Sequence, residues 1–265
     1  MLYFRLHILV HIGDTDLIKI LIKHGADINL VMNDGKTPID LACCYGNLEV
    51  IQMLLCCNAD VTKCHETGKS PLYVDSASNY KEVVSLLCTH CLDLLNLPNK
   101  NGKSPLYIAC RKGYEDMVKL SCNYRASVNQ RAEAGSTPLH SASLYGHKSV
   151  VELLIKQGAE VNESDKIGHT PLSMTCNQQN NEICKLLLAN GAAINSRDTI
   201  GPTSLHFAAS NTDLIRTPTE HGTSVNFDMN VGMTPIYVAC QFGHLEAVKM
   251  LLSYKANINR CEQHG

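Results

Sequence analysis

The sequence predicts an all-α solenoid, a fold in which short helix pairs stack one after another. The first observation is a string of the form Gly-x-[Thr/Ser]-Pro-[Leu/Ile], which recurs along the chain of 265 residues, with a damaged copy at Gly201. The Thr or Ser of successive copies stands at positions 37, 70, 104, 137, 170, 203 and 234. An Asn stands eight residues before six of these seven positions, at Asn29, Asn96, Asn129, Asn162, Asn195 and Asn226. A period of about 33 residues indicates repeats that bury their apolar faces only against one another.

Each repeat reads as two helices in the best-preserved copy. Thr137 is a good N-cap, and Pro138 suits the first helical position, where no backbone donor is needed. Gly146 ends this short inner helix, because glycine enters the left-handed conformation at little cost. A second helix follows up to Gly158, with an apolar face at helical spacing formed by Val150, Val151, Leu153 and Leu154. The stretch up to the next Gly-x-Thr-Pro is expected to be an extended, hairpin-like loop.

These residues closely resemble the ankyrin repeat. Its TPLH-x-A signature stands here as TPLHSA over residues 137–142 and, damaged, as TSLHFA over residues 203–208. The family's closing Gly-Ala-x-[Val/Ile]-Asn also matches at Asn29, Asn162 and Asn195. The resemblance implies one ankyrin-repeat domain over residues 1–265, an all-α ankyrin-repeat solenoid of helix-turn-helix units joined by hairpin-like loops. Its eight repeats span about 1–32, 33–65, 66–99, 100–132, 133–165, 166–198, 199–229 and 230–265.

Composition excludes several classes of partner. With 23 Lys and Arg against 25 Asp and Glu, the formal net charge of −2 gives no support for nucleic-acid binding. No uncharged apolar run is long enough to span a bilayer, so we expect no membrane insertion. The 13 cysteines lack a regular disulfide spacing, which favours reduced thiols and an intracellular, cytoplasmic protein, with the nucleus as an alternative.

The reactive side chains follow the repeat, which favours structural roles. The resemblance implies that histidines at the fourth place of the TPLH slot tie loops together by hydrogen bonds. Cys43, Cys110, Cys176 and Cys240 share a slot that the family usually fills with Ala, so we expect small buried residues there. We find no catalytic set, and GKS at Gly68 and Gly102 lacks P-loop context. The sequence therefore predicts no enzyme, no metal site and no cofactor.

The expected binding surface consists of hairpin tips and the exposed side of the inner helices, because the family binds partners there. Repeats two to four present a basic set at these positions, comprising Lys36, Tyr45, Lys69, Lys103, Arg111 and Lys112. Repeats five to eight present a more apolar set, comprising Leu144, Tyr145, His169, Met233, Gln241 and Phe242. Scattered solvated lysines are the alternative interpretation. The sharper interpretation is a groove for an extended segment that is acidic at one end and apolar at the other.

The resemblance implies a protein–protein interaction module, a scaffold or adaptor that binds partner proteins through its concave face without catalysis. A first alternative is the targeting or substrate-recruiting part of a larger enzyme or channel. A second is redox or zinc sensing by five cysteines, Cys56, Cys57, Cys64, Cys88 and Cys91.

Three residues depart from the pattern. Pro218 falls inside the second helix of repeat seven, where a proline costs about 3 kcal/mol. Asn79 replaces a glycine in repeat three. Asp75 replaces an inner-helix Ala, and we expect its carboxylate to be paired or to reach water, because a buried unpaired charge is costly.

Overall fold

A computed structural model shows helices throughout the part of the chain that it describes. The described residues are 3–63, 67–193, 205, 206, 209, 212–220, 224–226, 228 and 233–259, and no strand occurs among them. They confirm the predicted all-α class. The chain divides into two compact parts, residues 1–133 and 134–265.

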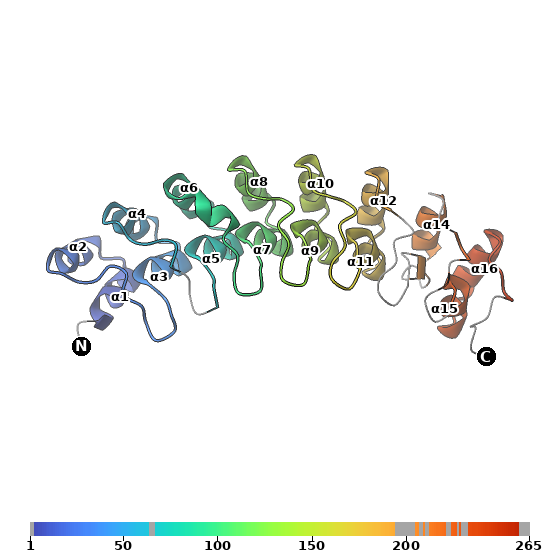
Figure 1. Ribbon diagram of the computed structural model, residues 1–265, viewed down its shortest axis with the longest axis horizontal. Helices are drawn as coiled ribbons and strands as arrows, with labels where there is room; N and C mark the ends of the chain where they lie inside the picture. Colours follow the sequence, from blue (N-terminus) through green and yellow to red (C-terminus); the bar gives the residue numbers. More distant parts are fainter. Residues whose placement is uncertain are drawn as a thin grey trace. The chain divides into compact units, whose positions relative to one another are not determined.

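In the N-terminal part, two layers of helices alternate along the chain (Figure 1). The inner layer consists of α1 (Tyr3–Ile12), α3 (Pro38–Tyr45), α5 (Pro71–Ser78) and α7 (Pro105–Lys112). The outer layer consists of α2 (Thr15–Lys23), α4 (Leu48–Cys56), α6 (Lys81–His90), the 3₁₀ helix η1 (Leu92–Asn96) and α8 (Glu115–Asn123). Each inner helix packs against the next inner helix and against its own outer helix.

The C-terminal part repeats this arrangement (Figure 1). Its inner helices include α9 (Pro138–Leu144), α11 (Pro171–Asn177) and α15 (Pro235–Gln241). Its outer helices are α10 (Lys148–Lys156), α12 (Asn181–Ala189), α14 (Thr212–Glu220) and α16 (Leu245–Ser253). Helix α12 packs against α14, and α14 against α16, so neighbouring repeats bury one another's apolar faces.

The predicted caps are present at the start of the inner helices. Thr37, Ser70, Ser104, Thr137, Thr170 and Thr234 each accept a hydrogen bond from the backbone amide three residues later, and a proline follows each of them. At the other end of α5, Asn79 takes the left-handed conformation with φ of 64°. Asparagine tolerates this conformation better than most side chains, which explains how it replaces the usual glycine.

The shared cysteine slot is buried in three of its four copies. Cys43, Cys110 and Cys176 are fully buried, as expected for residues in an Ala-like position. Cys240 is exposed, so the expectation of burial is wrong there.

Repeat seven keeps an uninterrupted outer helix. Helix α14 runs from Thr212 to Glu220 and therefore contains Pro218 in its interior, where the ring nitrogen has no hydrogen to donate. Near this point, the Thr219 hydroxyl donates to the backbone carbonyls of Ile215 at 2.8 Å and Arg216 at 2.9 Å. Much of the remaining repeat, including residues 194–204, lies outside the described residues.

Asp75 differs from the sequence-based expectation. Its side chain is fully buried in α5, and neither carboxyl oxygen has a hydrogen-bond partner. Burial raises the pKa of Asp75 well above its ordinary value, and the adjacent Cys43 thiol lowers this pKa by less. Burial thus favours the neutral form of this carboxyl, because protonation removes the cost of burying a charge.

We predict that Asp75→Ala stabilises the N-terminal part at neutral pH. Below about pH 4 the carboxyl is neutral in both states, and at higher pH the unfolded chain ionises first. The native protein therefore loses stability as pH rises toward the raised folded pKa of Asp75, by about 1.4 kcal/mol for each unit between the two pKa values.

Urea unfolding from pH 4 to pH 8, followed by circular dichroism, measures this difference. In the variant this decline in unfolding free energy should disappear, because the carboxyl has been removed. The variant should fold, since the equivalent slot of other repeats holds Ala42, Ala109 and Ala142. The exposed Asp93 is the control position, and Asp93→Ala should leave the decline in place. A decline of equal size in Asp75→Ala would contradict the assignment.

Candidate functional site

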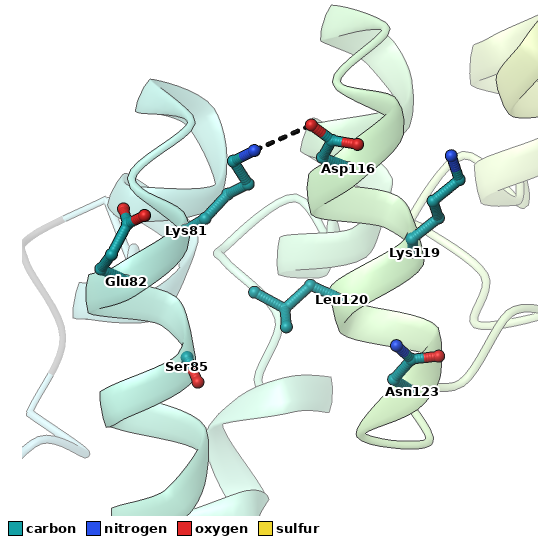
Figure 2. Close-up of a pocket in the computed structure, with 7 residues that line it drawn as sticks. All are labelled: Lys81, Glu82, Ser85, Asp116, Lys119, Leu120 and Asn123. Atoms are coloured by element: carbon teal, nitrogen blue, oxygen red, sulfur yellow. Dashed lines mark hydrogen bonds and ion pairs between the residues drawn. The ribbon is translucent and has the colours of Figure 1, made fainter.

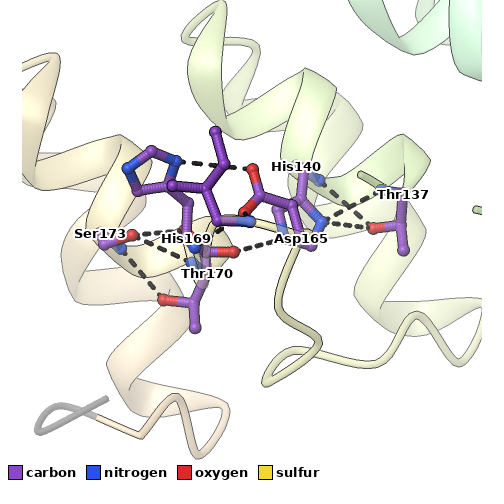
Figure 3. A network of polar contacts seen from close by, with 7 residues as sticks. Thr137, His140, Asp165, His169, Thr170 and Ser173 are labelled. Carbon is purple, nitrogen blue, oxygen red and sulfur yellow. Dashed lines mark hydrogen bonds and ion pairs between the residues drawn. The ribbon is translucent and has the colours of Figure 1, made fainter. Parts of the chain in front are cut away.

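The hairpin loops are held by the histidine of the TPLH slot. His140 is fully buried in α9, and its Nε2 lies 3.0 Å from the backbone carbonyl oxygen of His169 in the next repeat (Figure 3). A carbonyl oxygen only accepts, so Nε2 carries the hydrogen and donates. The other ring nitrogen, Nδ1, then accepts from the Thr137 amide at 3.1 Å. His206 makes the same contact, with its Nε2 3.0 Å from the Met233 carbonyl oxygen.

The next hairpin is shaped by its own polar side chains (Figure 3). Asp165 accepts hydrogen bonds at 2.9 Å from the backbone amides of Ile167 and His169, and its second oxygen lies 3.5 Å from His169 Nδ1. Thr170 then caps α11 with Ser173 as its reciprocal partner. The histidine and the acid thus hold the backbone of this hairpin loop.

A second set of contacts links consecutive repeats through the recurring Asn. In each case the side-chain oxygen accepts from a backbone amide 31 residues later, and we call these contacts the Asn brackets. The pairs are Asn29 with Asp60 at 2.8 Å, Asn96 with Ser127 at 2.8 Å, Asn162 with Ala193 at 2.6 Å, and Asn226 with Asn257 at 2.6 Å. The Asn therefore marks the position where one repeat holds the backbone of the next.

The residues of the basic set in the N-terminal part have different surroundings. The Lys36 ammonium is 2.9 Å from Asp34 in its own hairpin, and this hydrogen bond raises the pKa of Lys36. Lys36 is thus already paired with an acid. Tyr45 is exposed, and its ring centroid is 4.6 Å from that of His11 in the preceding repeat.

Among the other basic residues, Lys103 and Arg111 interact with two tyrosines of the inner helices. The Lys103 ammonium lies 5.5 Å from the ring centroid of Tyr107, within range of a cation–π interaction. Burial raises the pKa of Tyr73, and the positive charge of Arg111 lowers it by less. The charge of Arg111 on α7 therefore acts on the Tyr73 hydroxyl of α5. Lys69 and Lys112 are exposed nearby in sequence. Tyr73 and Tyr107 are themselves buried, with 6% and 8% of their surface accessible, while Lys103 is half-buried and Arg111 is exposed. We call these four residues the basic–aromatic surface, whose accessible part is the two cations.

The apolar set of the C-terminal part is partly available to solvent. Phe242 and Tyr145 are exposed, with 66% and 47% of their surface accessible, and Gln241 is also exposed. Leu144, His169 and Met233 are half-buried. His169 and Met233 also accept the histidine hydrogen bonds through their carbonyls, so these two positions serve the hairpins as well as the surface.

A pocket between the outer helices α6 and α8 was missed by the sequence analysis. It has a volume of about 510 Å³, and its lining carries both signs of charge (Figure 2). Lys81 Nζ is 2.8 Å from Asp116 Oδ2 across the pocket, and this bond raises the pKa of Lys81 and lowers that of Asp116. Lys148 and Glu182 form the same contact at 3.0 Å between α10 and α12. A Lys at the start of one outer helix and an acid near the start of the next are therefore a sequence signal for this ion pair.

A second missed surface lies on the first helix pair. Ile8 and Leu17 are about half exposed there, at 51% and 46%, and line an apolar pocket of about 230 Å³. The equivalent residues of repeat five, Ser141 and Val150, are buried.

The described residues form neither a metal site nor a membrane span. No group of three His, Cys, Asp or Glu side chains is arranged to hold a metal ion there. Within the same residues, no helix has the length and hydropathy needed to cross a bilayer. Of the five cysteines considered for sensing, Cys88 is buried, Cys56 is exposed and Cys64 lies outside the described residues. Burial raises the pKa of Cys88 to about 12, which makes its thiolate scarce.

The comparison with known protein families covers most of the chain. A family model for ankyrin repeats in three copies matches residues 4–65, 57–132, 120–198 and 172–261. The chain belongs to the ankyrin-repeat family. Ankyrin repeats are protein-interaction modules, so the family indicates protein partners for this chain.

Two plant proteins show local similarity to this ankyrin-repeat chain. A probable E3 ubiquitin-protein ligase of Oryza sativa subsp. japonica, XBOS33, is 38% identical over 60 residues, which is 22% of this chain and 12% of the ligase. The E3 ubiquitin-protein ligase XBAT33 of Arabidopsis thaliana is 35% identical over 60 residues, again 22% and 12%. The alignments thus span only about an eighth of each ligase.

We predict that Asn96→Ala loosens the join between repeats three and four. The change removes the acceptor for the Ser127 amide and should lower the unfolding free energy by about 0.5–1.5 kcal/mol. Hydrogen exchange should increase at the Ser127 amide more than at the Asp60 amide, whose own bracket to Asn29 is intact. Asn123→Ala, at an exposed position of α8, is the control. An unchanged exchange rate at the Ser127 amide would show that the bracket does not stabilise the join between the two repeats.

Proposed function

We propose that this ankyrin-repeat chain is a non-catalytic interaction module whose N-terminal part binds an acidic protein segment. The observation that carries the proposal is the basic–aromatic surface, in which Lys103 lies over the ring of the buried Tyr107 and Arg111 is exposed on the same helix pair. Arginine is enriched where proteins bind one another, because it combines contact area with hydrogen bonding.

The charges of this surface support an acidic ligand. Arg111 and Lys112 end α7, and Lys69 and Lys103 precede the capping serines of α5 and α7. Such positions favour diffusional encounter with a negatively charged segment, an effect that salt weakens. Lys36 contributes less, because Asp34 already neutralises it.

The C-terminal part is proposed to bind apolar side chains by itself. Tyr145 and Phe242 provide exposed aromatic area, and Gln241 adds a polar neighbour. Together the two proposals describe a scaffold or adaptor protein. We propose a cytoplasmic location, because the 13 cysteines lack the regular spacing of a disulfide framework.

A charge-reversal experiment tests the acidic-segment proposal. The variant Lys103→Glu with Arg111→Glu should slow association of a short fluorescein-labelled peptide that alternates Glu with Leu, by about tenfold or more at low salt. Anisotropy and stopped-flow measurements give affinity and association rate. The control variant, Lys23→Glu with Lys156→Glu, makes the same change in net charge on exposed outer-helix positions and should bind as before.

Circular dichroism must show that both variants remain folded. Equal association rates for the wild type and the Lys103/Arg111 variant at low salt would leave these residues as solvated surface. Equal slowing by the control variant would reduce the effect to net charge alone, and the proposal would fail.

We propose as a second candidate that the chain recruits substrates for ubiquitin transfer, as part of a larger enzyme. The observation that favours it is the 38% identity to the rice ligase. The affinity-purified full-length protein should then attach ubiquitin to a bound protein when supplied with activating and conjugating enzymes. The same preparation from cells that express only this ankyrin-repeat chain is the control. Absence of transfer from the full-length protein would eliminate this candidate.

A further inference from the structure

We propose that Cys176 and Cys184 form a redox modification site, where a peroxide converts the two thiols into a disulfide within repeat six. Their sulfur atoms are 3.7 Å apart, one on the inner helix α11 and one on the outer helix α12. Both side chains are fully buried. The site goes beyond partner binding and involves none of the cysteines singled out by their CxxC spacing or clustering.

The repeat itself explains why these two thiols meet. In each repeat, the residue six places after the capping Thr or Ser lies on the inner helix, and the residue fourteen places after it lies on the outer helix. These inner and outer slots hold Cys43 and Ile51, Ser76 and Val84, Cys110 and Val118, Ser143 and Val151, and Cys176 and Cys184, all of them buried. Repeat six alone has a cysteine in both slots, so ordinary repeat packing places its two thiols in contact.

The contact also prepares one sulfur to react. The two sulfurs are within hydrogen-bond distance, and either thiol can be the donor. A hydrogen bond from Cys176, together with the positive charge of Lys185, lowers the pKa of Cys184 despite burial. In contrast, burial raises the pKa of Cys110 well above its ordinary value and that of Cys122 to about 11. Since the thiolate is the nucleophile, Cys184 is the thiol of the pair that attacks first.

The reaction takes two balanced steps with hydrogen peroxide as oxidant. The Cys184 thiolate attacks one peroxide oxygen, a sulfur–oxygen bond forms, the oxygen–oxygen bond breaks, and hydroxide leaves as water after taking a proton. Cys176 sulfur then attacks Cys184 sulfur, a disulfide forms, and the sulfur–oxygen bond breaks. The Cys176 proton leaves with that hydroxyl as a second water. Two thiols are oxidised by two electrons, and one peroxide is reduced to two waters.

Burial determines the rate and the consequence of this reaction. Because neither sulfur is exposed, peroxide reaches the pair when repeat six opens locally, so the pair reacts more slowly than an exposed thiol such as Cys56. Once formed, the disulfide joins α11 to α12 and restrains their separation. Oxidation therefore tightens the repeat that contains His169 at its hairpin.

Peptide mass spectrometry of the oxidised full chain tests the proposal. A short pulse of N-ethylmaleimide first blocks exposed thiols of the reduced native protein, and hydrogen peroxide is added afterwards. The denatured protein is then treated with deuterated N-ethylmaleimide and digested with trypsin. Both cysteines fall in one peptide, residues 167–185, since no Lys or Arg lies between Lys166 and Lys185. We expect this peptide mainly in an unlabelled form about 2 Da lighter than the dithiol, for the loss of two hydrogens.

Two variants provide the controls. Cys184→Val restores the residue of Val84, Val118 and Val151, so it should fold normally and keep Cys176 as a thiol that takes the heavy label. Val118→Cys places a second thiol opposite Cys110, and a peroxide-dependent link should then appear between Cys110 and the introduced thiol. Circular dichroism checks that each variant retains its helices.

Three results would overturn the proposal. The first is a doubly heavy-labelled 167–185 peptide after about ten times the exposure that consumes the Cys56 thiol in an unblocked sample. The second is loss of the Cys176 thiol in Cys184→Val as fast as in the wild type, because Cys184 would then play no part. The third is the absence of any link to Cys110 in Val118→Cys, because the two slots would not determine reactivity.

Discussion

The stacking of one helix pair on the next is the constraint on which the rest of this structure depends. A pair such as α9 and α10 has too little apolar surface to fold alone, and its buried residues Leu139 and Val151 need neighbouring repeats to exclude water. Burial of apolar area is non-directional, so it holds the repeats together without fixing their register. The directional contacts come from the buried His140 and from the Asn brackets, which join one repeat to a defined backbone group of the next.

The periodic part of the fold could be predicted from the sequence because each periodic residue acts locally. Thr137 caps a helix through an amide three residues away, and a repeated five-residue string suffices to place such caps. The hairpin role of His140 was expected from the family resemblance, and its bond to the His169 carbonyl confirms that expectation. The Asn was recognised as a marker only, because its partner is 31 residues away and has no side-chain signature.

The remaining features depend on contacts between residues that the periodic pattern does not relate. Asp75 was expected to be paired or to reach water, but its side chain is fully buried, and burial raises its pKa by more than the adjacent Cys43 thiol lowers it. The neutralisation of Lys36 by Asp34 depends on the shape of a single hairpin. The contact of Cys176 with Cys184 requires knowledge of which inner and outer slots face each other. The candidate binding surface therefore stays a prediction from position, and the pairing of Lys36 shows that position alone does not give the charge available there.

The Asn brackets have a consequence for how such a chain can grow. Each bracket receives only a backbone amide, and the residues that supply it, Asp60, Ser127, Ala193 and Asn257, share no chemistry in their side chains. The join between repeats is therefore indifferent to sequence on the receiving side. A duplicated or exchanged stretch of one full period meets the same amide at the same place, whatever residues it carries. The exposed side chains of this chain are thus free to diverge from repeat to repeat, while the joins that space them remain the same.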